Sequence, residues 1–425
     1  MSKQLRIWLF VLLSTLLTST TLPAEGVITM TTSKALGEKI GLAIKANGSV
    51  TIIGVQEAAQ TDGYSKYYNL TSQTITIRGD VTLLYCSYSQ LTSLDVSKNT
   101  ALTTLECRDN QLTSLDVSSC TALTTLDCGY TQLTSLDVSG CIALTELNCG
   151  SNQLTSLDVS GCTALTELNC YGNQLTSLDV SGCTALTTLD CKLNPLTRVN
   201  LSNCKSLKEF SFSGAFLDQL TNLDISGCIA MTSLNCENNQ LTSLDVSGCT
   251  ALTKLDCSYN QLTSLDVSNN SALTKLNCSR NKLTSLDVSK NTALTSLYCF
   301  SNLLRQLNVT HCTNLYSLDC SKNQLKGTEM ANLVNSLPDR QGAEEGFFYV
   351  FSEQSWYGAV DVNVCLATHV AIAKAKNWRT QFYRKDKWRD YAGLDKPTFV
   401  VTYSSSNGGS ISITGADDLQ NELYV

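Results

Sequence analysis

A unit of 21 residues recurs through the middle of the chain. Its most regular part is the heptapeptide LTSLDVS, which begins at Leu91, Leu112, Leu133, Leu154, Leu175, Leu241, Leu262 and Leu283, with degenerate copies at Leu196, Leu220 and Leu304. Each unit has two halves with the skeleton L-x-x-L-x-[C/V/L]-x-x-[N/C], in which inward and outward residues alternate before a turn. One such coil cannot bury its own leucines, so coils must stack to form a continuous core.

This skeleton is the leucine-rich repeat pattern. The second half of each unit is rich in Thr, Ser and Val, which favours an extended segment over a helix. We therefore predict a β-rich leucine-rich repeat solenoid of 21-residue repeats, with strands on both faces and little helix. A β N-terminal cap and an α/β C-terminal cap would shield the ends of its core. Asn at the turns is expected to hydrogen-bond backbone groups that the turns leave unpaired.

The start of the chain resembles a targeting signal. Lys3 and Arg6 precede an apolar run from Ile7 to Leu17, and a polar stretch follows that ends at Ala24. This layout predicts a secretory signal peptide over residues 1–24. The alternative is a membrane helix, but the run is much shorter than the roughly 20 residues that span a bilayer. The chain is therefore expected to be secreted or to lie at the cell surface, either extracellular or associated with the outer membrane, without membrane insertion.

The remaining domains follow from the ends of the repeat. Residues 25–80 alternate apolar and polar residues and are expected to form the β cap, and residues 81–325 the solenoid. Residues 326–395 are expected to form the α/β cap, with a helix before Pro338, a strand over Gly346–Phe351 and a second helix that carries Cys365 and His369. That Cys–His pair could mimic a catalytic dyad, but core packing is the preferred interpretation. Residues 396–425 are expected to begin a partial β module with a hairpin.

The repeat has one irregularity, between Cys191 and Cys236. Their spacing of 45 residues is two units plus three residues, and the extra residues fall in Ser213–Gln219. Phe212 takes the position that cysteine holds in the other units. The preferred interpretation is a bulged loop with Phe212 filling core volume, and the alternative is a loop that shapes a partner site.

Nineteen of the 20 cysteines fall into two ladders. One ladder holds the strand position, at Cys86, Cys107, Cys128, Cys149, Cys170, Cys191, Cys236, Cys257, Cys278, Cys299 and Cys320. The other holds a turn position that alternates with Asn, at Cys120, Cys141, Cys162, Cys183, Cys204, Cys228, Cys249 and Cys312. Neighbours in register lie about 4.8 Å apart, farther than the Cβ separation that a disulfide needs. We expect buried free thiols, and neither disulfides nor a zinc site.

The repeat also resembles a known family. The segment LTTLDCGYTQLTSLDVSGC, with Cys at the strand position, is similar to the cysteine-ladder repeats of internalin J. It is more similar still to internalin-related surface proteins of Bacteroidales-type Gram-negative bacteria. The resemblance covers about residues 81–325. It implies a secreted or surface-exposed adhesin that works through protein contacts in attachment or biofilm formation, and it assigns no binding residues.

The positions that vary between units indicate where a partner would bind. They are the outward sites of the L-x-x-L-x-C strand and the residues just after it, and they share one face. The first half of this face is mainly acidic, and the second half adds cations. Aromatic side chains give large contact areas at low entropic cost. The predicted partner-binding residues are Tyr130, Tyr171, Tyr259, Tyr298, Phe300, Lys254, Lys275 and Arg280. The alternative is that these are drifting, solvent-exposed positions.

The opposite face carries a row of aspartates, which are Asp95, Asp116, Asp137, Asp158, Asp179, Asp224, Asp245, Asp266 and Asp287. Like charges at this spacing repel, so hydrogen bonds, counter-ions or protonation must relieve them. Carboxylate oxygens also suit calcium, but the calcium β-roll motif is absent from the sequence. We expect solvated aspartates that accept hydrogen bonds from neighbouring Ser and Thr.

Composition narrows the function classes. A net charge of −7 argues against nucleic-acid binding, and two histidines leave little scope for His-based catalysis or a His-rich metal site. We predict a non-enzymatic, cofactor-free protein that mediates protein–protein contacts in bacterial adhesion or biofilm formation. Its partner would be a protein on a bacterial or host surface. The alternative is a secreted host-interaction or glycan-binding factor without self-adhesion, and an enzyme or a threonine-array ice binder fits the repeats less well.

Overall fold

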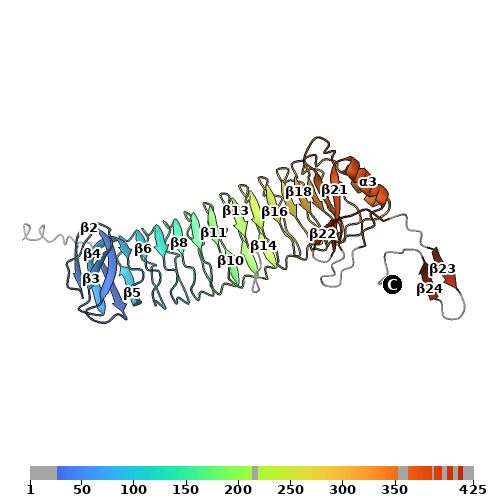
Figure 1. Cartoon of the computed structure of the whole chain (residues 1–425). Helices are drawn as coiled ribbons and strands as arrows, with labels where there is room; N and C mark the ends of the chain where they lie inside the picture. Colours follow the sequence, from blue (N-terminus) through green and yellow to red (C-terminus); the bar gives the residue numbers. More distant parts are fainter. Residues whose placement is uncertain are drawn as a thin grey trace, which may run out of the picture. The chain divides into compact units, whose positions relative to one another are not determined.

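The computed structural model describes residues 26–212, 219–352, 362–384 and 387–394, together with the backbone of strands at 400–404 and 410–414. The predicted signal peptide lies outside the described residues, as does the predicted insertion apart from Gln219. The chain divides into two compact units, residues 1–173 and residues 174–425, and Figure 1 traces their strands. Each unit is described by itself.

The first unit begins with an antiparallel β cap. β1 lies between β4 and β5, and β2 pairs with both β3 and β4. The strands of this cap are β1 (Val27–Thr32), β2 (Lys39–Ile53), β3 (Lys66–Asn69), β4 (Thr74–Tyr85) and β5 (Leu91–Lys98). Alternate residues of β1 and β4 are buried, as the sequence predicts for strands with one face on a core.

The coils of the first unit continue from β4 as a parallel sheet. Each contributes a strand of three residues, and these are β6 (Thr104–Glu106), β7 (Thr125–Asp127), β8 (Glu146–Asn148) and β9 (Glu167–Asn169). Leu105, Leu126 and Leu147 stand in register across this sheet and are buried. The 21-residue spacing therefore places identical residues beside each other and builds the predicted core.

The second unit has strands on both faces of its coils. The L-x-x-L-x-C segments contribute β11 (Thr188–Asp190), β13 (Glu209–Ser211), β15 (Ser233–Asn235), β16 (Lys254–Asp256), β17 (Lys275–Asn277), β18 (Ser296–Tyr298) and β19 (Ser317–Asp319). The opposite face carries a parallel sheet of β10 (Ser177–Asp179), β12 (Arg198–Asn200) and β14 (Asn222–Asp224). The predicted solenoid with little helix is confirmed. In the later described coils, the segment on the opposite face forms no strand. It is joined to the same segment of the neighbouring coil by one backbone hydrogen bond, such as Gln261 N–H to Leu241 O (2.9 Å).

Leucine and cysteine fill the interior of both units. Apart from the half-buried Leu189, the leucines of the L-x-x-L-x-C strands and the first cysteine ladder have exposed fractions of at most a few per cent. All 20 cysteines are buried thiols without a disulfide, as predicted. Each buried leucine contributes about 1.5–3 kcal/mol. Burial raises the pKa of the Cys278 thiol to about 12, so these thiols stay protonated. Phe212 is buried at the ladder position and its ring stacks on Phe210 with centroids 6.4 Å apart, which confirms its predicted place in the core.

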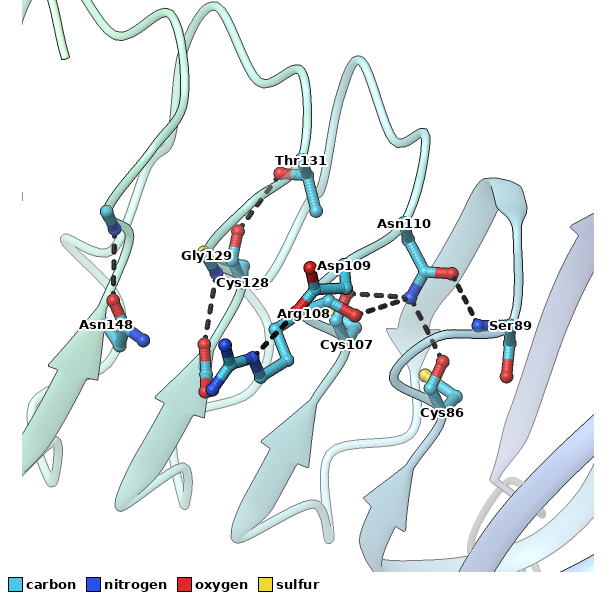
Figure 2. Close-up of polar contacts among 12 residues, drawn as sticks. Cys86, Ser89, Cys107, Arg108, Asp109, Asn110, Cys128, Gly129, Thr131 and Asn148 are labelled. Atoms are coloured by element: carbon cyan, nitrogen blue, oxygen red, sulfur yellow. Dashed lines mark hydrogen bonds and ion pairs between the residues drawn. The ribbon is translucent and has the colours of Figure 1, made fainter. Parts of the chain in front are cut away.

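The turn asparagines hold successive coils together. Figure 2 shows Asn110 donating from Nδ2 to the carbonyls of Cys86 (3.0 Å) and Cys107 (2.8 Å), while its Oδ1 accepts the Ser89 N–H (3.1 Å). In the second unit, Asn281 bonds to the carbonyls of Cys257 and Cys278 and accepts the Leu262 N–H. These buried bonds confirm the predicted role of Asn, because they satisfy backbone groups that the turn would otherwise leave unpaired.

The second cysteine ladder explains why Cys and Asn alternate there. The Cys249 thiol donates to the Ile225 carbonyl (3.7 Å), and Asn270 Nδ2, one unit later, donates to the equivalent Val246 carbonyl (3.0 Å). Both side chains thus serve the same carbonyl position of the preceding coil. The Asn270 Oδ1 atom is buried without a hydrogen-bond partner, which costs free energy that the smaller thiol avoids.

The second unit ends in an α/β cap. β20 (Gly346–Ser352), β21 (Trp378–Arg384) and β22 (Lys387–Asp390) extend the sheet of β19, and they are flanked by α2 (Thr328–Ser336) and α3 (Ala367–Ala375). The helix predicted before Pro338 and the strand predicted at Gly346–Phe351 are confirmed. The predicted hairpin is seen as β23 (Val400–Ser404) paired antiparallel with β24 (Ser410–Thr414), and its turn lies outside the described residues. The domain boundaries themselves stay predictions.

The prediction that Cys365 lies on the second helix is wrong. α3 begins two residues later because the preceding segment completes the last coil: Asn363 accepts the Leu325 N–H at 2.8 Å and donates to the Cys320 and Val350 carbonyls at 2.9 Å. Burial raises the pKa of the Cys365 thiol to about 12, and His369 is buried with its Nδ1 accepting the Leu366 N–H (3.1 Å). Both residues therefore serve packing, as the preferred interpretation expected.

Candidate functional site

The candidate site is the strand face, defined as the outward side chains of the L-x-x-L-x-C strands and the two residues after each ladder cysteine. Inward positions along these strands are nearly invariant, and outward positions change from coil to coil. β16 shows the pattern, because Leu255 is buried while Lys254 before it is exposed. The face is thus presented by a rigid sheet rather than by long loops.

The second residue after the ladder cysteine adopts an unusual backbone conformation. Its φ is 57° at Tyr88, 53° at Tyr130 and 54° at Tyr259, in the left-handed region that bulky residues seldom adopt. Bonds to the next coil fix this turn, as in Tyr130 N–H to Gly150 O (2.8 Å) and Tyr259 N–H to Ser279 O (3.0 Å). The three rings are exposed by 67%, 52% and 41% respectively. The turn therefore holds large aromatic side chains out in solvent.

In the first unit, two of these tyrosines enclose an arginine. The Arg108 guanidinium carbon lies 5.9 Å from the centroid of the Tyr88 ring and 5.4 Å from that of Tyr130, within the range of cation–π attraction. Its Nε donates to Asp109 Oδ2 at 2.9 Å, as Figure 2 shows. The Asp109 hydrogen bond also raises the Arg108 pKa. We call Tyr88, Arg108 and Tyr130 the first sandwich, and its arginine is neutralised within the coil.

The second unit contains an equivalent group that we call the second sandwich. The Arg280 guanidinium carbon lies 4.6 Å from the centroid of the Tyr259 ring and 5.8 Å from that of Phe300. The Arg280 Nε atom is buried and has no hydrogen-bond partner. The structure thus brings together three predicted site residues, and it leaves the donor at Nε unused.

Each of the remaining predicted residues lies on the strand face of its own unit. Lys254 and Lys275 are exposed register partners on β16 and β17. Tyr298 is half-buried, and its hydroxyl accepts a hydrogen bond from Ser317 Oγ (3.3 Å). In the first unit, Tyr171 is half-buried and its backbone N–H donates to Asn169 Oδ1 (3.0 Å). Tyr298 and Tyr171 are therefore less available to a partner than Tyr130 and Tyr259.

The acidic side chains on the strand face of the first unit affect the pKa of Glu106. Glu106 is half-buried on β6, and its pKa is raised, first by burial and then by the neighbouring Asp127. Arg108 opposes this shift. A negative partner is disfavoured here because Glu106, Asp127, Glu146 and Glu167 follow one another on adjacent strands.

Sequence reasoning missed Tyr88 and Arg108 as site residues, although a signal was present. When successive units are aligned, Arg108 stands between the tyrosines of the units before and after it, and Arg280 stands between Tyr259 and Phe300 in the same way. Alternation of a cation with aromatics at about 21 residues is therefore a readable mark of stacked side chains.

The opposite face behaves as predicted for hydrogen-bonded aspartates. Asp95 and Asp116 each accept both the backbone N–H and the hydroxyl of the serine two residues later, at 2.6–3.0 Å. The serine hydrogen bonds lower the pKa of both carboxyl groups. Among the residues that the structure describes, no three His, Cys, Asp or Glu side chains form a group suited to a metal ion. In the same part of the chain, no helix is long and apolar enough to cross a bilayer.

Comparisons with known proteins match this chain to leucine-rich repeat proteins. The model for leucine-rich repeats (two copies) matches residues 100–141, 142–182 and 229–270. A search of curated proteins gives no match. Among solved structures, the functional domain of InlJ from Listeria monocytogenes, which includes a cysteine ladder, is 32% identical over 68% of this chain and 78% of that one, with a TM-score of 0.39. A leucine-rich repeat protein of Leptospira interrogans is 24% identical over 57% and 66% of the two chains (TM-score 0.45). An internalin, inlF, from Listeria monocytogenes is 22% identical over 59% and 84% (TM-score 0.39).

Proposed function

Because this chain is a leucine-rich repeat protein with structural similarity to internalins, we propose that it is an exported, non-enzymatic scaffold that mediates protein–protein contacts in bacterial adhesion or biofilm formation. The strand face is its binding surface. The partner is a protein on a bacterial or host surface, reached from a secreted or surface-attached position. A closer kinship with cysteine-ladder surface proteins of Bacteroidales-type bacteria is part of the same proposal.

One observation carries the proposal: the strand face holds large aromatic side chains in solvent on a constrained backbone. Tyr130 and Tyr259 occupy left-handed positions where Ser151 and Ser301 stand in other coils, so the fold does not require a ring there. Exposed aromatics that the fold does not need are typical of interfaces, because they bury a large area and lose little entropy on binding. Both have an arginine against the ring, which adds a charged group to each anchor.

Adhesion of coated beads tests the proposal. Beads that carry the full chain are offered to cells of the producing bacterium and to host epithelial cells, and bound beads are counted. The test variant carries Tyr130→Ser and Tyr259→Ser, substitutions that other coils already contain at these positions. We expect adhesion of the wild-type beads to at least one cell type and a loss of about tenfold in the variant, since each hot-spot truncation costs more than about 1 kcal/mol.

A matched control removes exposed apolar side chains that precede the strands. Ile142 and Ile229 are exposed by 64% and 55%, and Thr163 occupies the same position in another coil. The double variant Ile142→Thr and Ile229→Thr is expected to adhere like the wild type. Equal loss in both variants would contradict a role for the strand face. Adhesion to host cells alone would favour the alternative of a host-interaction factor, and release by free glycans would favour a glycan-binding factor.

A further inference from the structure

The second sandwich borders a small pocket within the second unit. The pocket has a volume of about 180 Å³, and its lining includes Arg280, Phe300, Asp319, Lys322, Tyr383 and Trp388. A water molecule takes up about 30 Å³ of liquid, so this space would hold about six waters or one amino-acid side chain. The pocket thus brings two cations and three aromatic rings together at one place on the strand face and its cap.

The charges of the pocket favour one anionic group. Lys322 is buried, and Asp319 is buried with its Oδ1 accepting the Ser321 N–H (3.0 Å) and hydroxyl (2.7 Å). With Arg280, the formal charges of the described lining residues sum to +1. Arg280 lines the pocket, and a guanidinium group binds a carboxylate through two parallel hydrogen bonds. A single carboxylate on the Arg280 guanidinium would therefore neutralise this net charge.

The aromatic walls suit the aliphatic part of an acidic side chain. Trp388 packs against Tyr349 with tilted rings and against Tyr383 edge to face, with ring centroids 4.3 Å and 5.1 Å away, and it is exposed by 40%. These contacts hold the indole in place beside the pocket while part of it stays in contact with solvent. The methylene groups of a bound glutamate could pack on such a surface as its carboxylate reaches Arg280.

We propose that this pocket binds an acidic side chain, preferably glutamate, from an extended segment of the protein partner. This inference rests on the proposed function and names the chemistry of the partner. Lys254 and Lys275 lie on adjacent strands of the same sheet and supply further positive charge. An extended peptide places every second side chain on one side, so a segment with alternating acidic residues would present a row of carboxylates to this region.

The experiment measures fluorescence anisotropy of a labelled ten-residue peptide of alternating Glu and Ser mixed with the full chain. A peptide of alternating Gln and Ser is the ligand control. We expect the Glu peptide to bind at least about tenfold more tightly, since hydrogen bonds to charged groups are worth about 1.5–3 kcal/mol. Arg280→Gln should remove this difference, and Arg280→Lys should leave part of it because the charge remains without the fork. Arg198→Gln removes an exposed arginine from β12 on the opposite face; it is the matched control and should change nothing.

Three results would overturn the proposal. They are equal binding of the two peptides, equal loss in Arg280→Gln and Arg198→Gln, and Arg280-dependent binding of oligogalacturonate without binding of the Glu peptide, which would assign the pocket to an acidic sugar. Failure here is distinguishable from failure of the proposed function. If beads lose adhesion in the Tyr130→Ser and Tyr259→Ser variant but keep it in Arg280→Gln, the pocket proposal is wrong and the adhesion proposal still holds. A Glu peptide that binds while no bead adheres would do the reverse.

Discussion

In the first unit Arg108 lies between two tyrosines and pairs with Asp109, whereas in the second unit Arg280 lies between Tyr259 and Phe300 with its Nε unpaired. The coils around them share the same interior of leucine, cysteine and asparagine. One architecture thus carries one sandwich whose arginine has an ion-pair partner in its own coil and one whose arginine Nε has no partner. The interior ladders therefore decide the fold, and two or three outer residues per coil decide what the face can bind.

The largest expected effect tests whether the interiors are equivalent. Burial raises the pKa of Cys86 and Cys278 to about 12, and the ordinary thiol value is about 9. A raised pKa means that the native state keeps its proton while the unfolded state loses it. The contribution of the buried thiols to the free energy of unfolding is therefore fully present below about pH 9. Above that pH it decreases by about 1.4 kcal/mol per pH unit for each thiol. We expect both units to unfold between about pH 9 and 11. Circular dichroism recorded as a function of pH measures this unfolding.

Single-thiol variants sharpen this test. Cys86→Val and Cys278→Val each remove one titrating group, so the slope of unfolding free energy against pH above 9 should decrease by about 1.4 kcal/mol per pH unit in either variant. A chain that stays folded at pH 11 would contradict the expected effect of the thiols, and a change of slope in one variant alone would show that the two interiors differ.

The next effect concerns the asparagines. Asn152 and Asn281 each donate to three carbonyls and accept one leucine N–H, all in buried surroundings. Replacement of either by Ala leaves several buried groups unpaired and should lower the free energy of unfolding by about 3 kcal/mol. Urea denaturation measures the free energy of unfolding of both alanine variants.

A natural exception in the first unit provides the control. Thr131 occupies the asparagine position and donates to Cys128 O (3.0 Å) and to Asn152 Oδ1 (2.5 Å). Thr131→Asn should raise stability by about 1 kcal/mol, because the amide can make the bonds that its counterparts make. A loss of stability in this variant would contradict the account of the ladder.

The smallest effect separates the two sandwiches directly. Arg108→Gln breaks a partly exposed ion pair and should lower the free energy of unfolding by about 0.5 kcal/mol. Arg280→Gln loses two cation–π contacts but also removes a buried, unpaired donor, so it should lower the free energy of unfolding by less than Arg108→Gln does. Thermal unfolding at low and high salt distinguishes them, since only the Arg108 contribution should weaken with salt. Equal, salt-dependent losses would erase the difference between the units.

The interior could be predicted well from the sequence because the same pattern of buried residues recurs in every unit. Leucines, ladder cysteines and asparagines recur at 21 residues, so their burial and hydrogen bonding follow from stacking alone. The start of α3 was missed because Asn363 belongs to the last coil although no complete repeat surrounds it. The sandwiches were missed in part, because a contact between Arg280 and Tyr259 depends on a left-handed turn that no single residue announces.

The central claim is that the strand face of the second unit touches the partner. A photo-crosslinking amino acid placed at Tyr259 tests it most directly, with the same group at Ile229 as the control, since both positions are exposed. The chain is bound to cells, irradiated and analysed for protease-sensitive adducts. We predict an adduct at position 259 that excess unlabelled chain abolishes, and none at position 229. Adducts at 229 alone, or equal yields at both positions, would contradict the claim.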